Sequence, residues 1–266
     1  MSGFDFALVD RDGKVGWVKA REAGADFAYL NASPGNSVWN QAQAARDAGV
    51  TVGPYLFPPI HHSVDAATWA GDVIATVEEK LGDLPVAFDL ELPRGIKGTG
   101  MDRAGVATWV RTAVARLKRN RAYAPVLYSS ARVLDTDDAD TMAGAVNDLA
   151  GIDGCPLWLA YYNAGPVPTP SAWGRGNYWI HQRLGDTKGM FGVRQVDLDV
   201  FNYARFGNKG PRIEWLQRRL GMGRADCDGV FGLFTATKLR AFQKECGLTP
   251  DGIVGPKTFA YLATQP

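Results

Sequence analysis

Val86-Ala87-Phe88-Asp89-Leu90-Glu91 is the stretch of sequence that decides the fold of the larger, N-terminal part of the chain. The short apolar run predicts a buried strand, and two carboxylates close it, at Asp89 and Glu91. Side chains two positions apart on a strand point to the same face of a sheet. We therefore expect one strand to carry both carboxylates to the edge of a sheet.

Seven similar segments lie on either side of this strand and alternate with helix-like segments, a pattern typical of a parallel sheet. The expected strands are Phe4–Val9, Phe27–Asn31, Thr51–Phe57, Val86–Leu90, Pro125–Ser129, Leu157–Tyr161, Tyr178–Gln182 and Gln195–Phe201. The expected helices are Val15–Ala23, Trp39–Ala48, Asp65–Leu81, Asp102–Arg119 and Asp138–Leu149. Eight strands with five helices predict an α/β fold, an irregular TIM-like β/α barrel. In such barrels the chemistry lies at the carboxyl ends of the strands.

Further carboxylates lie on the first and last strands, which are neighbours in a closed barrel. Asp5 lies on the first strand, and Asp197 and Asp199 lie on the last. If these groups meet Asp89 and Glu91 inside the barrel, burial and mutual repulsion raise one pKa. The result is an acid beside a carboxylate, as glycoside cleavage requires. The alternative is that they are solvated strand ends on an outer face.

Aromatic side chains also lie at or near the expected strand ends, where they could form stacking surfaces for sugar rings. They are Tyr55, Phe57, Tyr128, Trp158, Tyr161 and Trp179. Each of them taken alone has a plain alternative as a core residue.

The C-terminal part contains an internal repeat. Asp228-Gly229-Val230-Phe231-Gly232-Leu233-Phe234-Thr235 recurs as Asp251-Gly252-Ile253-Val254-Gly255-Pro256-Lys257-Thr258. Each copy predicts a turn followed by a helix, because Asp-Gly favours turns and Thr can cap a helix. With the amphipathic segment at 213–220, the repeat predicts a small three-helix domain.

Composition and charge exclude several classes of protein. The 266 residues are 46% hydrophobic and 21% charged, with a formal net charge of +1, which fits a globular chain and gives no reason to expect nucleic acid as a partner. The residues after Lys209 are mildly basic, with eight Lys or Arg against five Asp or Glu. Three cysteines, an odd number, argue against a disulfide framework, although a Cys227–Cys246 bridge stays open. We expect no export signal and no membrane span.

The larger part resembles the family 25 glycoside hydrolases, lysozymes that cleave the β-1,4 bond between N-acetylmuramic acid and N-acetylglucosamine. The resemblance covers nearly all of residues 3–203. It is carried by Gly3-Phe4-Asp5, Gly53-Pro54-Tyr55, Phe88-Asp89-Leu90-Glu91, Leu127-Tyr128-Ser129, Leu157-Trp158-Leu159-Ala160-Tyr161-Tyr162 and Val196-Asp197-Leu198-Asp199-Val200-Phe201. One departure is Pro34, which stands where the family often has a carboxylate.

The resemblance implies a role for each site residue. Glu91 is the expected proton donor, Asp89 keeps it protonated and orients the acetamido group, and Asp197 and Asp5 stabilise positive charge on the sugar ring. The resemblance leaves three attacking groups open: a carboxylate, the acetamido oxygen and water. The expected substrate-binding residues are Tyr55, Tyr128, Trp158, Tyr161 and Asp199.

The tail resembles the peptidoglycan-binding domain of cell-wall hydrolases, through the repeat together with Leu216-Gln217, Phe242-Gln243 and Gly247-Leu248. The resemblance implies that the tail binds the wall, and Asp228, Gly229, Asp251 and Gly252 mark its motif. The expected division is a catalytic barrel at 1–206, a linker at 207–211 and the wall-binding domain at 212–266.

Together these features predict an endolysin-type lysozyme that needs no metal or other cofactor and acts as a monomer on bacterial peptidoglycan. We expect it to be made in the host cytoplasm and to reach the wall after release. Two alternatives stay open: a wall-binding barrel without muramidase activity, and a glycosidase for a different glycan.

Overall fold

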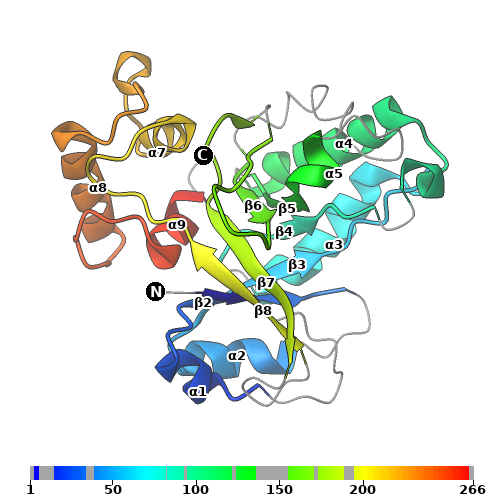
Figure 1. Cartoon of the computed structure of the whole chain (residues 1–266), viewed down its shortest axis with the longest axis horizontal. Coiled ribbons are helices and arrows are strands. Elements are labelled where there is room, and N and C mark those ends of the chain that lie inside the picture. Colours follow the sequence, from blue (N-terminus) through cyan, green and yellow to red (C-terminus); the bar gives the residue numbers. More distant parts are fainter. Residues whose placement is uncertain are drawn as a thin grey trace.

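The fold is seen in a computed structural model, which describes residues 3–5, 15–33, 39–81, 83–92, 95–121, 124–135, 155–170, 173–188 and 195–263. Figure 1 shows a curled sheet with the helices α3, α4 and α5 on its right and the tail helices on its left. No helix within the described ranges is both long and apolar enough to cross a membrane.

Eight strands form one curled, mostly parallel sheet. They are β1 (Gly3–Asp5), β2 (Phe27–Asn31), β3 (Thr51–Leu56), β4 (Ala87–Asp89), β5 (Val126–Ser130), β6 (Leu157–Ala160), β7 (Ile180–Lys188) and β8 (Gln195–Phe201). Their order is β1-β8-β7-β6-β5-β4-β3-β2, and the neighbours from β2 to β7 run parallel. The adjacency of the first and last strands, expected from the sequence, is confirmed.

The expectation of a wholly parallel sheet is wrong at one edge. β8 runs antiparallel to both β7 and β1. Only residues 189–194 separate β7 from β8, and a parallel pair needs a crossover of a dozen or more residues. The last two strands therefore form a hairpin.

The helices accompany the strands in the expected order. They are α1 (Trp17–Glu22), α2 (Trp39–Asp47), α3 (Ala66–Leu81), the 3-10 turn η1 (Ile96–Thr99), α4 (Arg103–Arg121) and α5 (Ala131–Asp135). The sequence pattern did not predict α5, which is five residues long. The helix expected at Asp138–Leu149 lies outside the described residues.

Alternation along the strands separates two buried layers. On β4, Phe88 packs in the layer between the sheet and the helices, whereas Ala87 belongs to the layer inside the curl of the sheet. On β5, Leu127 and Val126 divide in the same way. Because side chains two positions apart share a face, the carboxylates that follow Ala87 along β4 also face the inside.

The tail contains α7 (Pro211–Arg219), the turn η4 (Arg224–Asp226), α8 (Leu233–Glu245) and α9 (Pro256–Ala263). The three α-helices agree with the predicted three-helix domain. They enclose fully buried apolar side chains: Ile213, Leu216, Leu239, Phe259 and Leu262. Cys227 and Cys246 are free thiols, so no disulfide links them.

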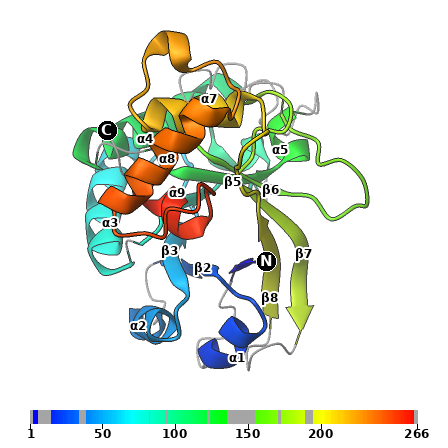
Figure 2. The same cartoon turned by 90° about the vertical axis from the view of Figure 1, so that its left-hand side faces the viewer.

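The tail is docked on the sheet by buried aromatic rings. Trp215 on α7 lies with its ring centroid 5.1 Å from that of Trp179, and Phe259 on α9 lies 5.1 Å from the same Trp179 ring. Phe201, the last residue of β8, also contacts Phe259, at 5.5 Å. The interior of the sheet and the tail thus share one continuous apolar core. Figure 2 shows the tail helices lying across the molecule above β2 and β3.

The segment before α7 is tied to the tail by backbone hydrogen bonds. Ala204 and Val254 bond to each other in both directions, at 2.8 and 3.3 Å. Gly207 donates to Phe231 at 3.0 Å, and Gly210 donates to Gly229 at 2.9 Å. The residues expected to form the linker, 207–211, are therefore held against the tail along much of their length.

Candidate active site

A cavity of about 200 Å³ opens at the carboxyl ends of the parallel strands. Residues from β3, β4, β5, β6, β7 and β8 line it, either within these strands or just after them. They are Tyr55, Phe57, Asp89, Glu91, Tyr128, Trp158, Tyr162, Gln182, Gly185 and Asp197. Most of the side chains that the sequence predicted to converge do so here.

Asp89 lies at the floor of this cavity and is only 7% exposed. Burial raises the pKa of Asp89 to about 9, and the nearby carboxylates of Glu91 and Asp197 contribute to the increase. Its buried Oδ1 atom has no hydrogen-bond partner. A carboxyl with this pKa is protonated at neutral pH, so Asp89 itself holds a proton when no substrate is bound.

Glu91 stands at the rim, two residues further on, and its side chain is exposed in the opening. Partial removal from water raises the pKa of Glu91, and the charge of Asp197 raises it further. The family resemblance implied that Asp89 keeps Glu91 protonated. The structure assigns that effect to Asp197 because the more deeply buried Asp89 is neutral.

Asp197 on β8 is held by a chain of hydrogen bonds. Its Oδ2 atom accepts from Nε2 of Gln182, at 3.1 Å. The side-chain oxygen of Gln182 accepts from the hydroxyl of Tyr128 at 2.8 Å and also from that of Tyr162. Because two hydroxyls bond to its oxygen, the amide of buried Gln182 must present its nitrogen to Asp197.

Asp5 lies directly opposite Asp197 in the antiparallel ladder between β1 and β8. Its backbone therefore borders the same part of the sheet. The side chain of Asp5 lies outside the described part of the structure.

Asp199 was expected to bind substrate, but it is fully buried and does not line the cavity. Its Oδ1 atom accepts a hydrogen bond of 2.7 Å from Nε1 of Trp158. Asp199 thus lies beneath the site and holds the indole ring that forms part of its wall.

Only some of the aromatic residues that the sequence predicted for the site line the cavity. Tyr55, Tyr128 and Trp158 line the cavity, whereas Tyr161 does not and its neighbour Tyr162 takes that place. Trp179 precedes β7 and lies at the opposite ends of the strands, in the core shared with the tail.

Sequence reasoning missed Tyr162, Gln182 and Gly185 as site residues. A signal existed for Gln182, because it ends the expected strand Tyr178–Gln182 and an amide needs a hydrogen-bond partner when it is buried. A signal also existed for Tyr162, because it lies four residues after Trp158 and strand alternation places both on one face.

The Asp-Gly motif of the tail has a structural role in this fold. Gln217 donates to Asp228 Oδ1 at 2.7 Å and accepts from the backbone nitrogen of Gly229 at 2.9 Å. Gln243 bonds in the same way to Asp251, at 2.8 Å, and to Gly252, at 2.9 Å. The motif residues thus hold the two turns in place.

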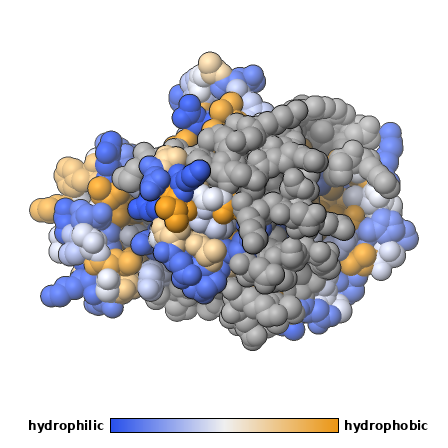
Figure 3. Space-filling view, turned by 90° about the horizontal axis from the view of Figure 1, so that it is seen from below, coloured by the Kyte–Doolittle hydropathy of each residue, from blue (hydrophilic) through white to orange (hydrophobic). Residues whose placement is uncertain are grey.

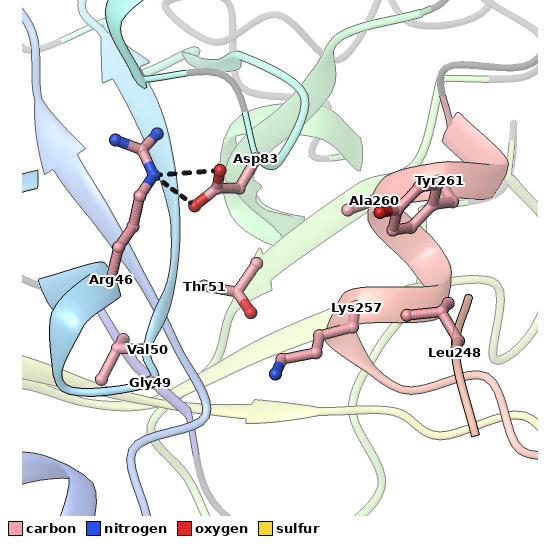
Figure 4. A pocket seen from close by; sticks show the side chains of 9 residues that line it. All are labelled: Arg46, Gly49, Val50, Thr51, Asp83, Leu248, Lys257, Ala260 and Tyr261. Carbon is pink, nitrogen blue, oxygen red and sulfur yellow. Dashed lines mark hydrogen bonds and ion pairs between the residues drawn. The ribbon is translucent and has the colours of Figure 1, made fainter. Parts of the chain in front are cut away.

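Two larger cavities lie between the tail and the amino-terminal ends of the strands. One, of about 560 Å³, is lined by Arg46, Asp83, Lys257 and Tyr261 among others. Figure 4 shows Arg46 paired with Asp83 on one side and Lys257 on the other. No group of three or more possible metal-binding side chains occurs in the part of the chain that the structure describes.

Comparison with known proteins agrees with this architecture. Residues 209–262 match the family described as a peptidoglycan binding domain. Lysozyme M1 of Streptomyces globisporus is 25% identical over 200 residues, a match that covers 71% of this chain and 64% of that protein, just under two thirds of its length.

Two solved structures share the fold. The bacterial lysozyme from Streptomyces coelicolor is 23% identical, with a TM-score of 0.60, over 76% of this chain and 92% of that one. The muramidase from Trichobolus zukalii is 24% identical, with a TM-score of 0.59, over 76% of this chain and 93% of that one. The family match itself covers residues 8–190, more than half of the sequence, and on that ground the chain belongs to glycosyl hydrolases family 25.

Proposed function

We propose that this protein hydrolyses the β-1,4 bond between N-acetylmuramic acid and N-acetylglucosamine in bacterial peptidoglycan. One observation carries the proposal: Glu91 stands at the rim of a cavity beside Asp89 and Asp197, and its pKa is raised. A raised pKa increases the fraction of Glu91 that carries a proton, and a protonated carboxyl can protonate a leaving glycosidic oxygen. The lysozyme and muramidase relatives support this substrate.

The arrangement suggests a division of labour among the carboxyl groups. Glu91 is the proton donor, since it is the carboxyl closest to solvent and so to an entering glycan. The negative charge of Asp197, which raises the pKa of Glu91, also stabilises positive charge that develops on the ring, and Gln182 holds this carboxylate by a hydrogen bond. We assign the same role to Asp5, on the adjoining strand.

Neutral Asp89 has a different task in this proposal. Its buried carboxyl has an oxygen with no partner on the protein. A protonated carboxyl can donate a hydrogen bond to the carbonyl oxygen of an acetamido group and so fix the sugar in place. Tyr55, Phe57 and Tyr162 supply the apolar walls against which the ring packs.

The test is release of reducing ends from purified peptidoglycan by the wild type and by Glu91→Gln. We expect the substitution to reduce release by a factor of 100 or more, about the contribution of general acid catalysis. Glu22→Gln, which changes an exposed glutamate on α1, is the matched control and should match the wild type.

Two outcomes would refute the assignment. Wild-type protein that binds the wall without releasing reducing ends would favour a wall-binding protein without muramidase activity. Full release by Glu91→Gln would remove Glu91 from the role of proton donor.

We further propose that the barrel is irregular and closes between β1 and β2, and that residues 1–206 carry catalysis while residues 212–266 bind the wall. The protein would then act as a monomer of the endolysin type, made in the host cytoplasm and active on the wall after release. Light scattering of the purified chain tests the monomer, and fractionation of infected or expressing cells before and after lysis tests the route.

A further inference from the structure

The tail contains two copies of one structural unit. In the first copy, Nε2 of Gln217 donates to Asp228, to the carbonyl of Val230 and to Thr235, at 2.7, 3.1 and 3.1 Å. In the second, Nε2 of Gln243 donates to the corresponding Asp251, Ile253 and Thr258, at 2.8, 3.0 and 3.2 Å.

Because the hydrogen bonds match one for one, each position of the first copy has an equivalent in the second. Val230 corresponds to Ile253, Leu233 to Pro256 and Phe234 to Lys257. Each copy therefore carries a face equivalent to that of the other.

The second copy uses its face to dock on the sheet. Pro256 is buried, and Ile253 is half-buried. The neighbouring Gly255 lies so close to Tyr203 that an added Cβ would stand 3.0 Å from its ring. Apart from Lys257, which is exposed, this face is covered by the body of the protein.

The first copy leaves the equivalent face open. Its three residues are apolar and exposed: Val230 at 37%, Leu233 at 74% and Phe234 at 53%. The ammonium group of Lys238, one turn along α8, lies 5.7 Å from the centre of the Phe234 ring. Figure 3 shows hydrophobic surface at the left-hand end of the molecule, the end that the tail occupies in Figure 1.

Three adjacent exposed apolar side chains mark an interaction site, because such groups gain free energy when they are covered. An aromatic ring beside a cation suits a sugar polymer that also bears carboxylates, since the ring stacks on the sugar and the ammonium attracts the anion. Peptidoglycan has both features, in its glycan strands and in its peptide carboxylates. The mildly basic charge of the tail adds to this complementarity.

We propose that Val230, Leu233, Phe234 and Lys238, which we call the first-repeat face, form the surface through which the tail binds peptidoglycan. The inference rests on the proposed function, which it deepens by assigning the wall contact to one of the two repeats. The second copy anchors the tail to the catalytic body instead, through buried Pro256 and half-buried Ile253.

The test is sedimentation of the full-length protein with purified insoluble peptidoglycan, kept cold to limit hydrolysis. We expect Phe234→Lys, which installs the residue of the second copy, to weaken binding about tenfold, the equivalent of one lost ring contact. Phe234→Tyr keeps the ring and should bind within about twofold of the wild type. Tyr261→Lys is the matched control, because it replaces another exposed aromatic of the tail, on the second-repeat side.

Thermal unfolding of each variant shows whether the chain stays folded. Wild-type binding by Phe234→Lys would overturn the proposal, and so would a loss with Tyr261→Lys that equals the loss with Phe234→Lys. Equal losses in Phe234→Tyr and Phe234→Lys would also overturn it, since the ring would then not matter.

The measurement separates this proposal from the proposed function. If the wild type releases reducing ends and Phe234→Lys binds as well as the wild type, the first-repeat face is not the binding surface, but the proposed hydrolase function stands. If Phe234→Lys binds more weakly and the wild type releases no reducing ends, the first-repeat face is the binding surface, but the proposed hydrolase function is wrong.

Discussion

Replacing Asp89 by Asn should stabilise the protein, by an amount that grows with pH. Asp89 is 7% exposed, and its pKa rises to about 9 in the folded chain. In the unfolded chain an aspartate titrates near pH ~3.9. Between these two values the folded state holds a proton that the unfolded state has released, so stability falls as the pH rises through this window.

The size of the effect follows from the two pKa values. Neutral pH lies about three pH units above the pKa of Asp89 in the unfolded chain. Each of these pH units lowers the free energy of unfolding by about 1.4 kcal/mol. Wild-type protein should therefore lose up to ~4 kcal/mol of unfolding free energy between about pH 4 and pH 7 through this one group. Asn has nearly the shape of a protonated Asp and cannot titrate, so Asp89→Asn avoids the loss.

Urea unfolding at several pH values from about 4 to about 8.5, followed by tryptophan fluorescence, measures the difference between Asp89→Asn and the wild type. The difference should be near zero at the acidic end and reach several kcal/mol at neutral pH. Asp226→Asn, which removes an exposed carboxyl in the tail, controls for the loss of one surface charge. A difference between Asp89→Asn and wild type that stays constant with pH would show that Asp89 is ionised and refute the reasoning.

Three further predictions concern the tail and the cavity. Trp215→Ala should lower the unfolding free energy by about 3–5 kcal/mol, since it removes a buried ring between Trp179 and the tail core; urea titration measures it. Asp197→Asn removes the charge that raises the pKa of Glu91, so the basic limb of the kcat/KM profile should move to lower pH, whereas a merely structural loss would lower kcat/KM equally at every pH. Gly229→Ala should lower the free energy of unfolding by more than about 1 kcal/mol, because the φ of +69° at Gly229 is unfavourable for alanine and the new Cβ would lie 3.2 Å from a backbone oxygen; thermal unfolding measures it.

The sequence predicted β2 to β6 well because each of them is a short, mostly apolar run. β7 was predicted poorly: it was expected to end at Gln182, but it continues through a polar stretch to Lys188. The bounds of β2 and β8 agree with expectation residue for residue. The direction of β8 could not be read in the same way, since an apolar run fixes the strand but not the strand's partner or sense. Only the short connection before β8 carried that information.

Alternation made most of the candidate site predictable, even two residues past the end of a strand. Asp89 and Glu91 both face the cavity, as their spacing required. On β6, Trp158 and Ala160 face the inside, and Tyr162 continues this alternation beyond the end of the strand, so Tyr162 rather than Tyr161 lines the cavity. Burial depth was also beyond the sequence, and it decides that Asp89 rather than Glu91 has the more strongly raised pKa.

The position of the tail restricts how the protein can approach its substrate. The cavity lies at the carboxyl ends of the parallel strands, whereas Trp179 and the docked tail lie at their amino-terminal ends. A shared apolar core and a hydrogen-bonded connecting segment hold the tail there, so it does not swing on a free tether. If the first-repeat face binds the wall, the glycan segment that it holds differs from the segment that enters the cavity. The tail would then retain the enzyme in the wall while successive bonds within reach of the cavity are cleaved.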